Sequence, residues 1–153
     1  ANNDPAADYP AAMLALSATV HTSKRDIAAD DFFVGLFETA LEEDELITAV
    51  SFTIPEKAGY AKFPNPASRY ALAGVFVVKR PDGVRVAVTG AGEDGVFRVP
   101  PFEEALSGTF DASALEGAAV PADGLMSDIH ASAEYRANLV AVMAKRAVEA
   151  ANG

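Results

Sequence analysis

The strongest local pattern in the chain is ALAGVFVVKRPDGVRVAV, which runs from Ala71 to Val88. Residues 71–79 are an apolar run and residues 84–88 alternate between apolar and polar, so each segment predicts a β-strand. The connection is Arg80-Pro81-Asp82-Gly83, in which proline presets φ, aspartate bonds back to the backbone and glycine accepts a positive φ. The stretch therefore predicts an antiparallel hairpin.

Elements of both kinds flank this hairpin. Strands are expected over residues 17–22, 45–54 and 96–99, and helices over residues 9–16, 102–106, 112–115 and 132–150. Asp8 is expected to cap the first helix, and residues 30–35 are expected to form a loop that packs its aromatic rings inward. Strands followed by helices predict an α+β fold, with an antiparallel three-stranded sheet covered on one face by about three helices. The Pro/Gly-containing connector 55–59 predicts two lobes, residues 1–57 and 58–153.

Composition and charge narrow the function classes. Lys and Arg number 12 against 22 Asp and Glu, a net charge of -10, so a nucleic-acid partner is not expected. The chain has no cysteine, which excludes disulfides and iron–sulfur clusters ligated by this chain. No apolar run approaches the roughly 20 residues that cross a bilayer, so we expect no membrane span and a cytoplasmic location.

Several familiar binding-site and active-site patterns are absent or lack the neighbouring residues that they require. The glycine-rich segment 90–95 resembles a dinucleotide-binding loop, but strand-like residues follow it where a helix N-terminus is required, so we expect a loop between strands. His21 and His130 have no acidic or cysteine neighbours at metal-ligand spacing, and no Gly-x-Ser-x-Gly motif is present. No catalytic residue and no metal site are therefore predicted.

The opening phrase, residues 2–10, concentrates amides and carboxylates just before a helix. Asparagine amides can donate to phosphate oxygens and a carboxylate can accept from ribose hydroxyls, as in many nucleotide sites. Ordinary capped turns have the same composition, so both interpretations stay open. The candidate ligand-binding residues here are Asn2, Asn3, Asp4 and Asp8.

A family resemblance covers nearly the whole chain. The segments that carry it are Asp4-Pro5-Ala6-Ala7-Asp8-Tyr9-Pro10, Asp31-Phe32-Phe33-Val34-Gly35, Glu45-Leu46-Ile47, Pro66-Ala67-Ser68-Arg69-Tyr70-Ala71-Leu72, Val88-Thr89-Gly90-Ala91-Gly92 and Ser132-Ala133-Glu134-Tyr135-Arg136. In this order they resemble the FAD-carrying medium subunit of molybdenum hydroxylases, the carbon monoxide dehydrogenase and xanthine dehydrogenase family. The first lobe resembles the end of the FAD-binding domain, and the second resembles the flavoprotein C-terminal domain.

The resemblance implies an electron-transfer role with FAD as cofactor. The flavin of this family takes electrons from iron–sulfur clusters of a small subunit and passes them to an external acceptor, while a molybdenum large subunit oxidises the substrate. By position, Asn2 and Asp8 touch the diphosphate and ribose region, Ile47 lines the pocket and Lys62 lies near the flavin. Tyr70 matches the aromatic residue that covers the isoalloxazine ring; its alternative is a tyrosine packed at a strand start.

Two departures from the family bear on the site. Arg69 stands where many members have an acidic residue, so the charge beside the flavin differs. The family's glycine-rich phosphate-binding segments lie upstream of the opening phrase, so the resemblance implies a fragment with a partly formed FAD site. The substrate stays open, and the alternative functions are a docking module without functional flavin and an unrelated ligand-binding domain.

Overall fold

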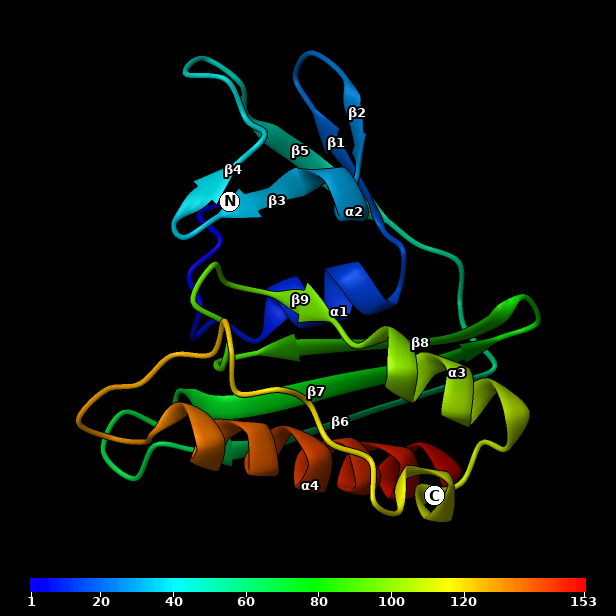
Figure 1. The fold of residues 1–153 in the computed structure, drawn as a ribbon. Coiled ribbons are helices and arrows are strands. Elements are labelled where there is room, and N and C mark those ends of the chain that lie inside the picture. The colour runs from blue at the N-terminus through cyan, green and yellow to red at the C-terminus, as the bar shows by residue number, and fades with distance from the viewer.

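The computed structural model describes residues 1–153 and contains a central antiparallel sheet, helices on both of its faces, and a smaller group of strands beyond one of these helices (Figure 1). The predicted α+β fold class is confirmed. The helices are α1 (Tyr9–Ala15), α2 (Ala29–Phe32), α3 (Pro100–Gly108), the 3-10 turn η1 (Ala112–Leu115) and α4 (Ala133–Asn152). The strands are β1 (Thr19–Thr22), β2 (Asp26–Ala28), β3 (Phe33–Gly35), β4 (Glu38–Thr39), β5 (Ile47–Ser51), β6 (Lys57–Pro64), β7 (Ala71–Arg80), β8 (Gly83–Thr89) and β9 (Phe97–Arg98).

The central sheet has the order β6-β7-β8-β9, and each neighbouring pair is antiparallel. The predicted hairpin is confirmed, because β7 and β8 pair up to Arg80 opposite Gly83. The expectation of three strands was wrong, since β6 adds a fourth that pairs along β7 from Lys57 to Pro64. Its sequence, KAGYAKFP, has no continuous apolar run and contains glycine and proline, so the strand pattern is weak.

Alternate residues of the sheet face two different cores. Val75 and Val77 of β7 belong to a cluster with α3 and α4, whereas Val78 packs with Leu14 of α1. The expectation of one covered face was therefore wrong. Helix α1 is short, but its buried face packs on β7 and β8, so the central strands are buried on both sides. This agrees with the nearly continuous apolar run of β7.

Helix α4 lies unusually close to β6. A Cβ added to Gly59 would stand 2.0 Å from the carbonyl oxygen of Ala147, so any side chain there would collide with the helix backbone. The N-terminus of α4 is capped by Ser132, whose hydroxyl accepts from the amide of Tyr135. Asp111 caps η1 in the same way, through the amide of Ser113.

The smaller strands form a sheet of order β2-β1-β5 and the pair β3-β4. Residues 30–35 were expected to be a loop, but they form most of α2 and the strand β3. Phe32 is buried there, as predicted. Asp30 of α2 bonds Arg85 at 2.6 Å and lies 3.5 Å from Arg98, so charge pairs as well as apolar packing hold this region to the central sheet.

The link between β5 and β6 comprises residues 52–56, close to the predicted lobe boundary. Helix α1 nevertheless packs on the central sheet although it precedes that boundary in sequence. The division into residues 1–57 and 58–153 stays a prediction. No helix is both long enough and apolar enough to cross a membrane.

Candidate functional site

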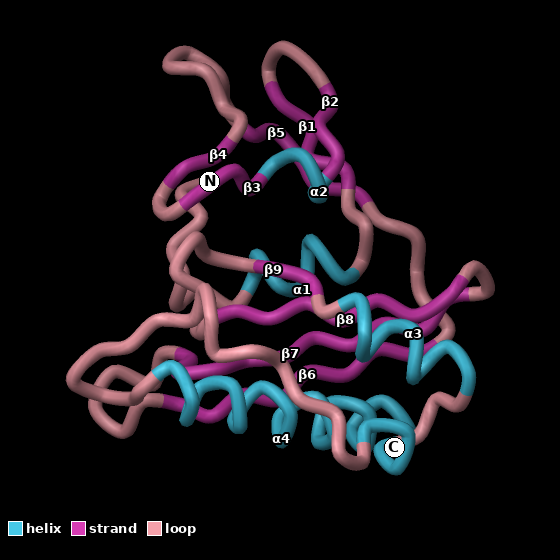
Figure 2. Tube along the Cα trace, viewed as in Figure 1, coloured by secondary structure: helices cyan, strands magenta, loops and turns pink.

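The loops that carry most of the predicted site residues gather at one end of the central sheet (Figure 2). The opening turn, residues 4–8, is fixed to the end of β8. The buried hydroxyl of Thr89 lies 2.6 Å from the carbonyl oxygen of Ala7 and 3.1 Å from that of Pro5, and the amide of Gly90 donates to Pro5 at 2.6 Å. Two family-like motifs about 80 residues apart are therefore joined in one structure.

Asp8 and Lys62, both predicted site residues, form an ion pair at 2.9 Å. Asp8 does not cap α1, which corrects the sequence expectation: its backbone is helical and its side chain makes no capping bond. The carboxylate instead accepts from Lys62 and from the hydroxyl of Tyr60, two residues apart on one face of β6. Burial, reinforced by the Asp8 carboxylate, raises the pKa of Tyr60 well above its usual range.

Gly74 provides the space for the Tyr60 hydroxyl. A Cβ at Gly74 would lie 2.5 Å from that oxygen and 3.1 Å from the methyl group of Thr89. The Tyr60 ring stacks on Phe76 with centroids 5.9 Å apart, which fixes its plane. A small residue at 74 thus allows the tyrosine to reach across β7 toward the opening turn.

Tyr70 ends the turn between β6 and β7 and keeps 63% of its surface exposed. Buried Asn65 organises this turn: its amide donates to the Tyr70 carbonyl at 2.7 Å, and its side-chain oxygen accepts from the amides of Ala67 and Ser68. Arg69 has φ +66°, in the left-handed region that side chains with a Cβ rarely adopt. This conformation redirects the chain immediately before Tyr70.

A cavity of about 240 Å³ lies beside Tyr70 and joins its turn to the opening turn. Its walls come from five segments of the chain: residues 5–6, 65–72, 90, 126–130 and 136. The lining residues are Pro5, Ala6, Asn65, Ser68, Tyr70, Ala71, Leu72, Gly90, Met126, Asp128, His130 and Arg136. The cavity therefore combines the exposed Tyr70 ring with amide, hydroxyl, carboxylate and guanidinium groups.

The inner wall of this cavity carries an ion pair between a buried arginine and a partly exposed aspartate. Arg136 is 2% exposed and donates to Asp128 at 2.8 Å. Burial alone would raise the pKa of Asp128, but hydrogen bonds from the amides of His130 and Ala131 and from Arg136 outweigh it and hold that pKa below its ordinary value. The carboxylate therefore stays charged and fixes residues 128–131.

The other predicted residues lie elsewhere. Asn3 is buried, with φ +44°, and its amide donates to the carbonyls of Gly35 and Asp94, so it joins two turns and faces away from solvent. Asn2 and Asp4 are exposed. Ile47 lines a separate apolar cavity of about 300 Å³, together with Ala1, Tyr9, Pro10, Met13, Val20, Phe32, Phe33, Val50 and Phe52.

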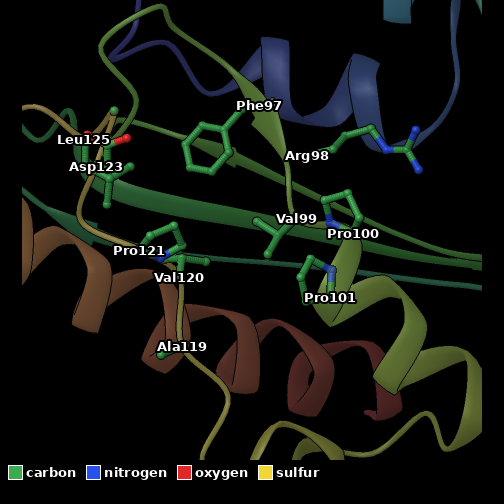
Figure 3. Close-up of a pocket in the computed structure, with 11 residues that line it drawn as sticks. Phe97, Arg98, Val99, Pro100, Pro101, Ala119, Val120, Pro121, Asp123 and Leu125 are labelled. Atoms are coloured by element: carbon green, nitrogen blue, oxygen red, sulfur yellow. The ribbon is translucent and has the colours of Figure 1, made fainter.

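The largest cavity, about 370 Å³, contains none of the predicted site residues (Figure 3). It lies between the start of α3 and residues 119–125, and its walls are mostly valine, proline and phenylalanine. Arg98 points away from it in Figure 3 and is held by Glu103 at 2.5 Å. We therefore assign the candidate site to the smaller polar cavity beside Tyr70, where the sequence motifs converge.

Comparisons with known proteins identify the family of the chain. Residues 1–56 match the family described as FAD binding domain in molybdopterin dehydrogenase. The chain is 38% identical to the nicotine 6-hydroxylase medium subunit of Paenarthrobacter nicotinovorans over 97% of its own length and 57% of that protein. It is 35% identical to the carbon monoxide dehydrogenase medium chain of Afipia carboxidovorans, over 99% of its length and 58% of the relative. The chain belongs to the medium-subunit family of molybdenum hydroxylases.

Solved structures of this medium-subunit family share the fold over the whole chain. Reconstituted CO dehydrogenase from Oligotropha carboxidovorans superposes with a TM-score of 0.82 at 29% identity, covering 98% of this chain and 58% of that one. Quinoline 2-oxidoreductase from Pseudomonas putida 86 superposes with a TM-score of 0.79 at 27% identity, covering 100% of this chain and 59% of that one. The chain thus spans somewhat less than three-fifths of the length of these relatives.

Sequence reasoning missed four residues that build the site. Asn65 lies beside a recognised motif and Tyr60 lies two residues before Lys62, but nothing in their local sequence marks them. Thr89 and Arg136 lie inside recognised motifs and were not singled out, because their roles depend on partners that are distant in sequence. The position of Thr89 and Arg136 within family motifs was the signal that the sequence offered.

Proposed function

We propose that this chain forms part of the FAD-carrying electron-transfer subunit of a molybdenum hydroxylase. The flavin takes electrons from iron–sulfur clusters of a small subunit and passes them to an external acceptor, while substrate oxidation occurs at molybdenum on a large subunit. The observation that carries the proposal is the polar cavity that joins the opening turn to exposed Tyr70. Family membership and the match of residues 1–56 to an FAD-binding domain support the same function.

Each residue has a defined task in this proposal. Tyr70 covers one face of the isoalloxazine ring and limits access of water to it, since its ring is exposed and its backbone is fixed by Asn65. Lys62 provides a positive charge near the cofactor, while Asp8 neutralises and orients the ammonium group. Asn2, being exposed, remains available to donate to the diphosphate. FAD, when bound, supplies the redox chemistry, and these side chains bind and orient it.

Asn3 and Asp4 have narrower tasks. The Asn3 amide is already donated to two carbonyls, so we propose that it shapes the opening turn without direct cofactor contact. Asp4 accepts from the amide of Ala6 at 2.9 Å and stabilises the same turn. Ile47 then contributes to the apolar wall of the neighbouring cavity. The cytoplasmic location expected from the sequence stays part of the proposal.

A second function is favoured by one observation. The cavity near Ile47 is lined mainly by hydrophobic residues, and two of them, Val50 and Phe52, are exposed. Ile54, two residues further along the chain, is exposed as well. Such a surface is typical of a protein contact. A docking module that assembles the complex without functional flavin would use this surface and would make no demand on Tyr70.

The deciding experiment is an absorption spectrum with iron and molybdenum analysis of the native complex, purified through a tag on the full-length gene product. Flavin together with both metals supports the electron-transfer function, and metals without flavin support the docking module. A colourless protein without metals would contradict both. Tyr70→Ala should then change flavin emission in the complex, whereas Arg146→Ala, an exposed change on α4, should leave emission unaltered.

A further inference from the structure

Arg136 is the largest fully buried side chain in the chain, and it lies in the first turn of α4. One guanidinium nitrogen, Nη1, donates to the carbonyls of Leu72 and Gly90, each at 2.7 Å. The other, Nη2, donates to Asp128 at 2.8 Å. A single side chain therefore bonds two backbone carbonyls and one carboxylate, on segments that are distant from one another in sequence.

All three partners line the polar cavity. Leu72 follows Tyr70 by two residues, so the first bond fixes the start of β7. Gly90 carries the amide that donates to Pro5 at 2.6 Å, so the second bond fixes the site to which the opening turn is attached. Asp128 is the third partner. Arg136 thus sets the spacing between Tyr70 and the opening turn.

A buried arginine is a costly way to pack a helix. Desolvating a guanidinium is unfavourable, and a hydrophobic residue of similar volume often stabilises a core equally well. Only one carboxylate compensates the charge of Arg136, and its Nε has no hydrogen-bond partner. A role in shape or electrostatics at the cavity accounts for the group better than stability does.

We propose that Arg136 is a positioning residue that holds Tyr70 and the opening turn in register for the flavin ring. Part of this inference rests on the proposed function, namely that the cavity receives the flavin. The guanidinium acts on the ring through Tyr70 and the two carbonyls, and the Asp128 carboxylate compensates its charge. Lysine cannot reproduce the three directed bonds, because its ammonium group lacks the planar fork of arginine.

Amide hydrogen exchange on the full-length protein tests the positioning without any flavin. The reporters are the amide of Asn65, bonded to the Tyr70 carbonyl, and the amide of Gly90, bonded to Pro5. In Arg136→Lys both should exchange faster by about tenfold or more, because a charge-assisted hydrogen bond is lost at each segment. The exchange rates of amides between residues 139 and 148 of α4 should stay within about twofold of the wild-type rates. The exposed control Arg146→Lys should change the rates of neither the reporter amides nor the helix amides. Unchanged protection of both reporters in folded Arg136→Lys would overturn the proposal.

A second variant covers the case in which Arg136→Lys does not fold. Asp128→Asn removes the charged partner and leaves the bonds to Leu72 and Gly90 available. We expect the same two reporter amides to exchange faster by a smaller factor. Protection equal to the wild type at both amides would again contradict a positioning role.

Flavin emission in the complex tests the functional half of the inference. A phenol ring against an isoalloxazine ring quenches its fluorescence, so Tyr70→Ala should brighten the flavin in the otherwise wild-type protein. In an Arg136→Lys background the same Tyr70→Ala change should have at most about half that effect, because Tyr70 is already displaced. A full Tyr70 effect in that background would overturn the proposal. If the wild-type complex holds no flavin, the proposed function fails, and the exchange data still decide the role of Arg136.

Discussion

Thr89→Val is the perturbation that most sharply probes how the opening turn is held. The Thr89 side chain is fully buried, and its hydroxyl lies 2.6 Å from the carbonyl of Ala7 and 3.1 Å from that of Pro5. Valine has nearly the same volume, so the change removes the donor and leaves the packing in place. A buried group left without its hydrogen bond costs about 1–3 kcal/mol.

We expect Thr89→Val to lower the free energy of unfolding by about 2 kcal/mol. The loss stays within that range because the Pro5 carbonyl still accepts from the amide of Gly90 at 2.6 Å. For a domain of this size each kcal/mol lowers Tm by about 2–4 °C, which gives a decrease of roughly 4–8 °C. Differential scanning calorimetry measures this value. Flavin retention after gel filtration of the full-length protein should fall with it, since the turn would no longer be fixed beside the cavity.

Thr89→Ser is the matched control, because it keeps the hydroxyl and removes one methyl group. That loss costs about 1 kcal/mol. Serine should therefore retain more flavin and a higher Tm than valine, although valine fills the core better. If valine equals or exceeds serine in both measurements, packing rather than the hydroxyl holds the opening turn, and our reasoning is refuted.

Three further predictions concern charge and close packing. A hydrogen bond from Arg25 is the main cause that lowers the pKa of Glu45 from 4.5 to about 2. The contribution of Glu45 to the free energy of unfolding should therefore be complete above about pH 4.5 and be lost as the pH falls toward 2. Urea titrations of Glu45→Gln should lack this loss. Because the pKa of Tyr60 is raised, the folded state keeps a proton that the unfolded chain releases at alkaline pH. The free energy of unfolding should therefore fall as the pH rises above about 10. A Tyr60→Phe variant with the same alkaline loss of stability would contradict this. Gly59→Ala should destabilise by about 1–3 kcal/mol or more through its clash with α4, whereas Gly108→Ala, which meets nothing within 4 Å, should not; equal Tm values for the two would exclude the close contact.

The hairpin and the long helix were predictable because their signals are local. The apolar run of β7, the turn at Pro81 and the helical spacing from Ser132 onward each act within a few residues. β6 was missed because its stability comes from pairing along β7. Gly59 allows close contact with α4, and Tyr60 donates to Asp8, and neither contact is visible in the local sequence. Tertiary contacts override local propensity there.

The site followed a similar division. Lys62 and Tyr70 came from the family resemblance, whereas Asp8 came first from the composition of the opening phrase. The structure joins Asp8 and Lys62 in an ion pair. The inward orientation of Asn3 could not be predicted, since it depends on the carbonyls of Gly35 and Asp94, which are 32 and 91 residues away in sequence. The anchoring by Thr89 and Arg136 depends on equally distant partners.

The most direct test of the central claim is a density map of the full-length protein in its complex with FAD bound. The account predicts the isoalloxazine ring in van der Waals contact with the Tyr70 ring, within about 4 Å, at the cavity bounded by the opening turn and Arg136. A flavin bound elsewhere, with Tyr70 out of contact and the cavity empty, would contradict the account.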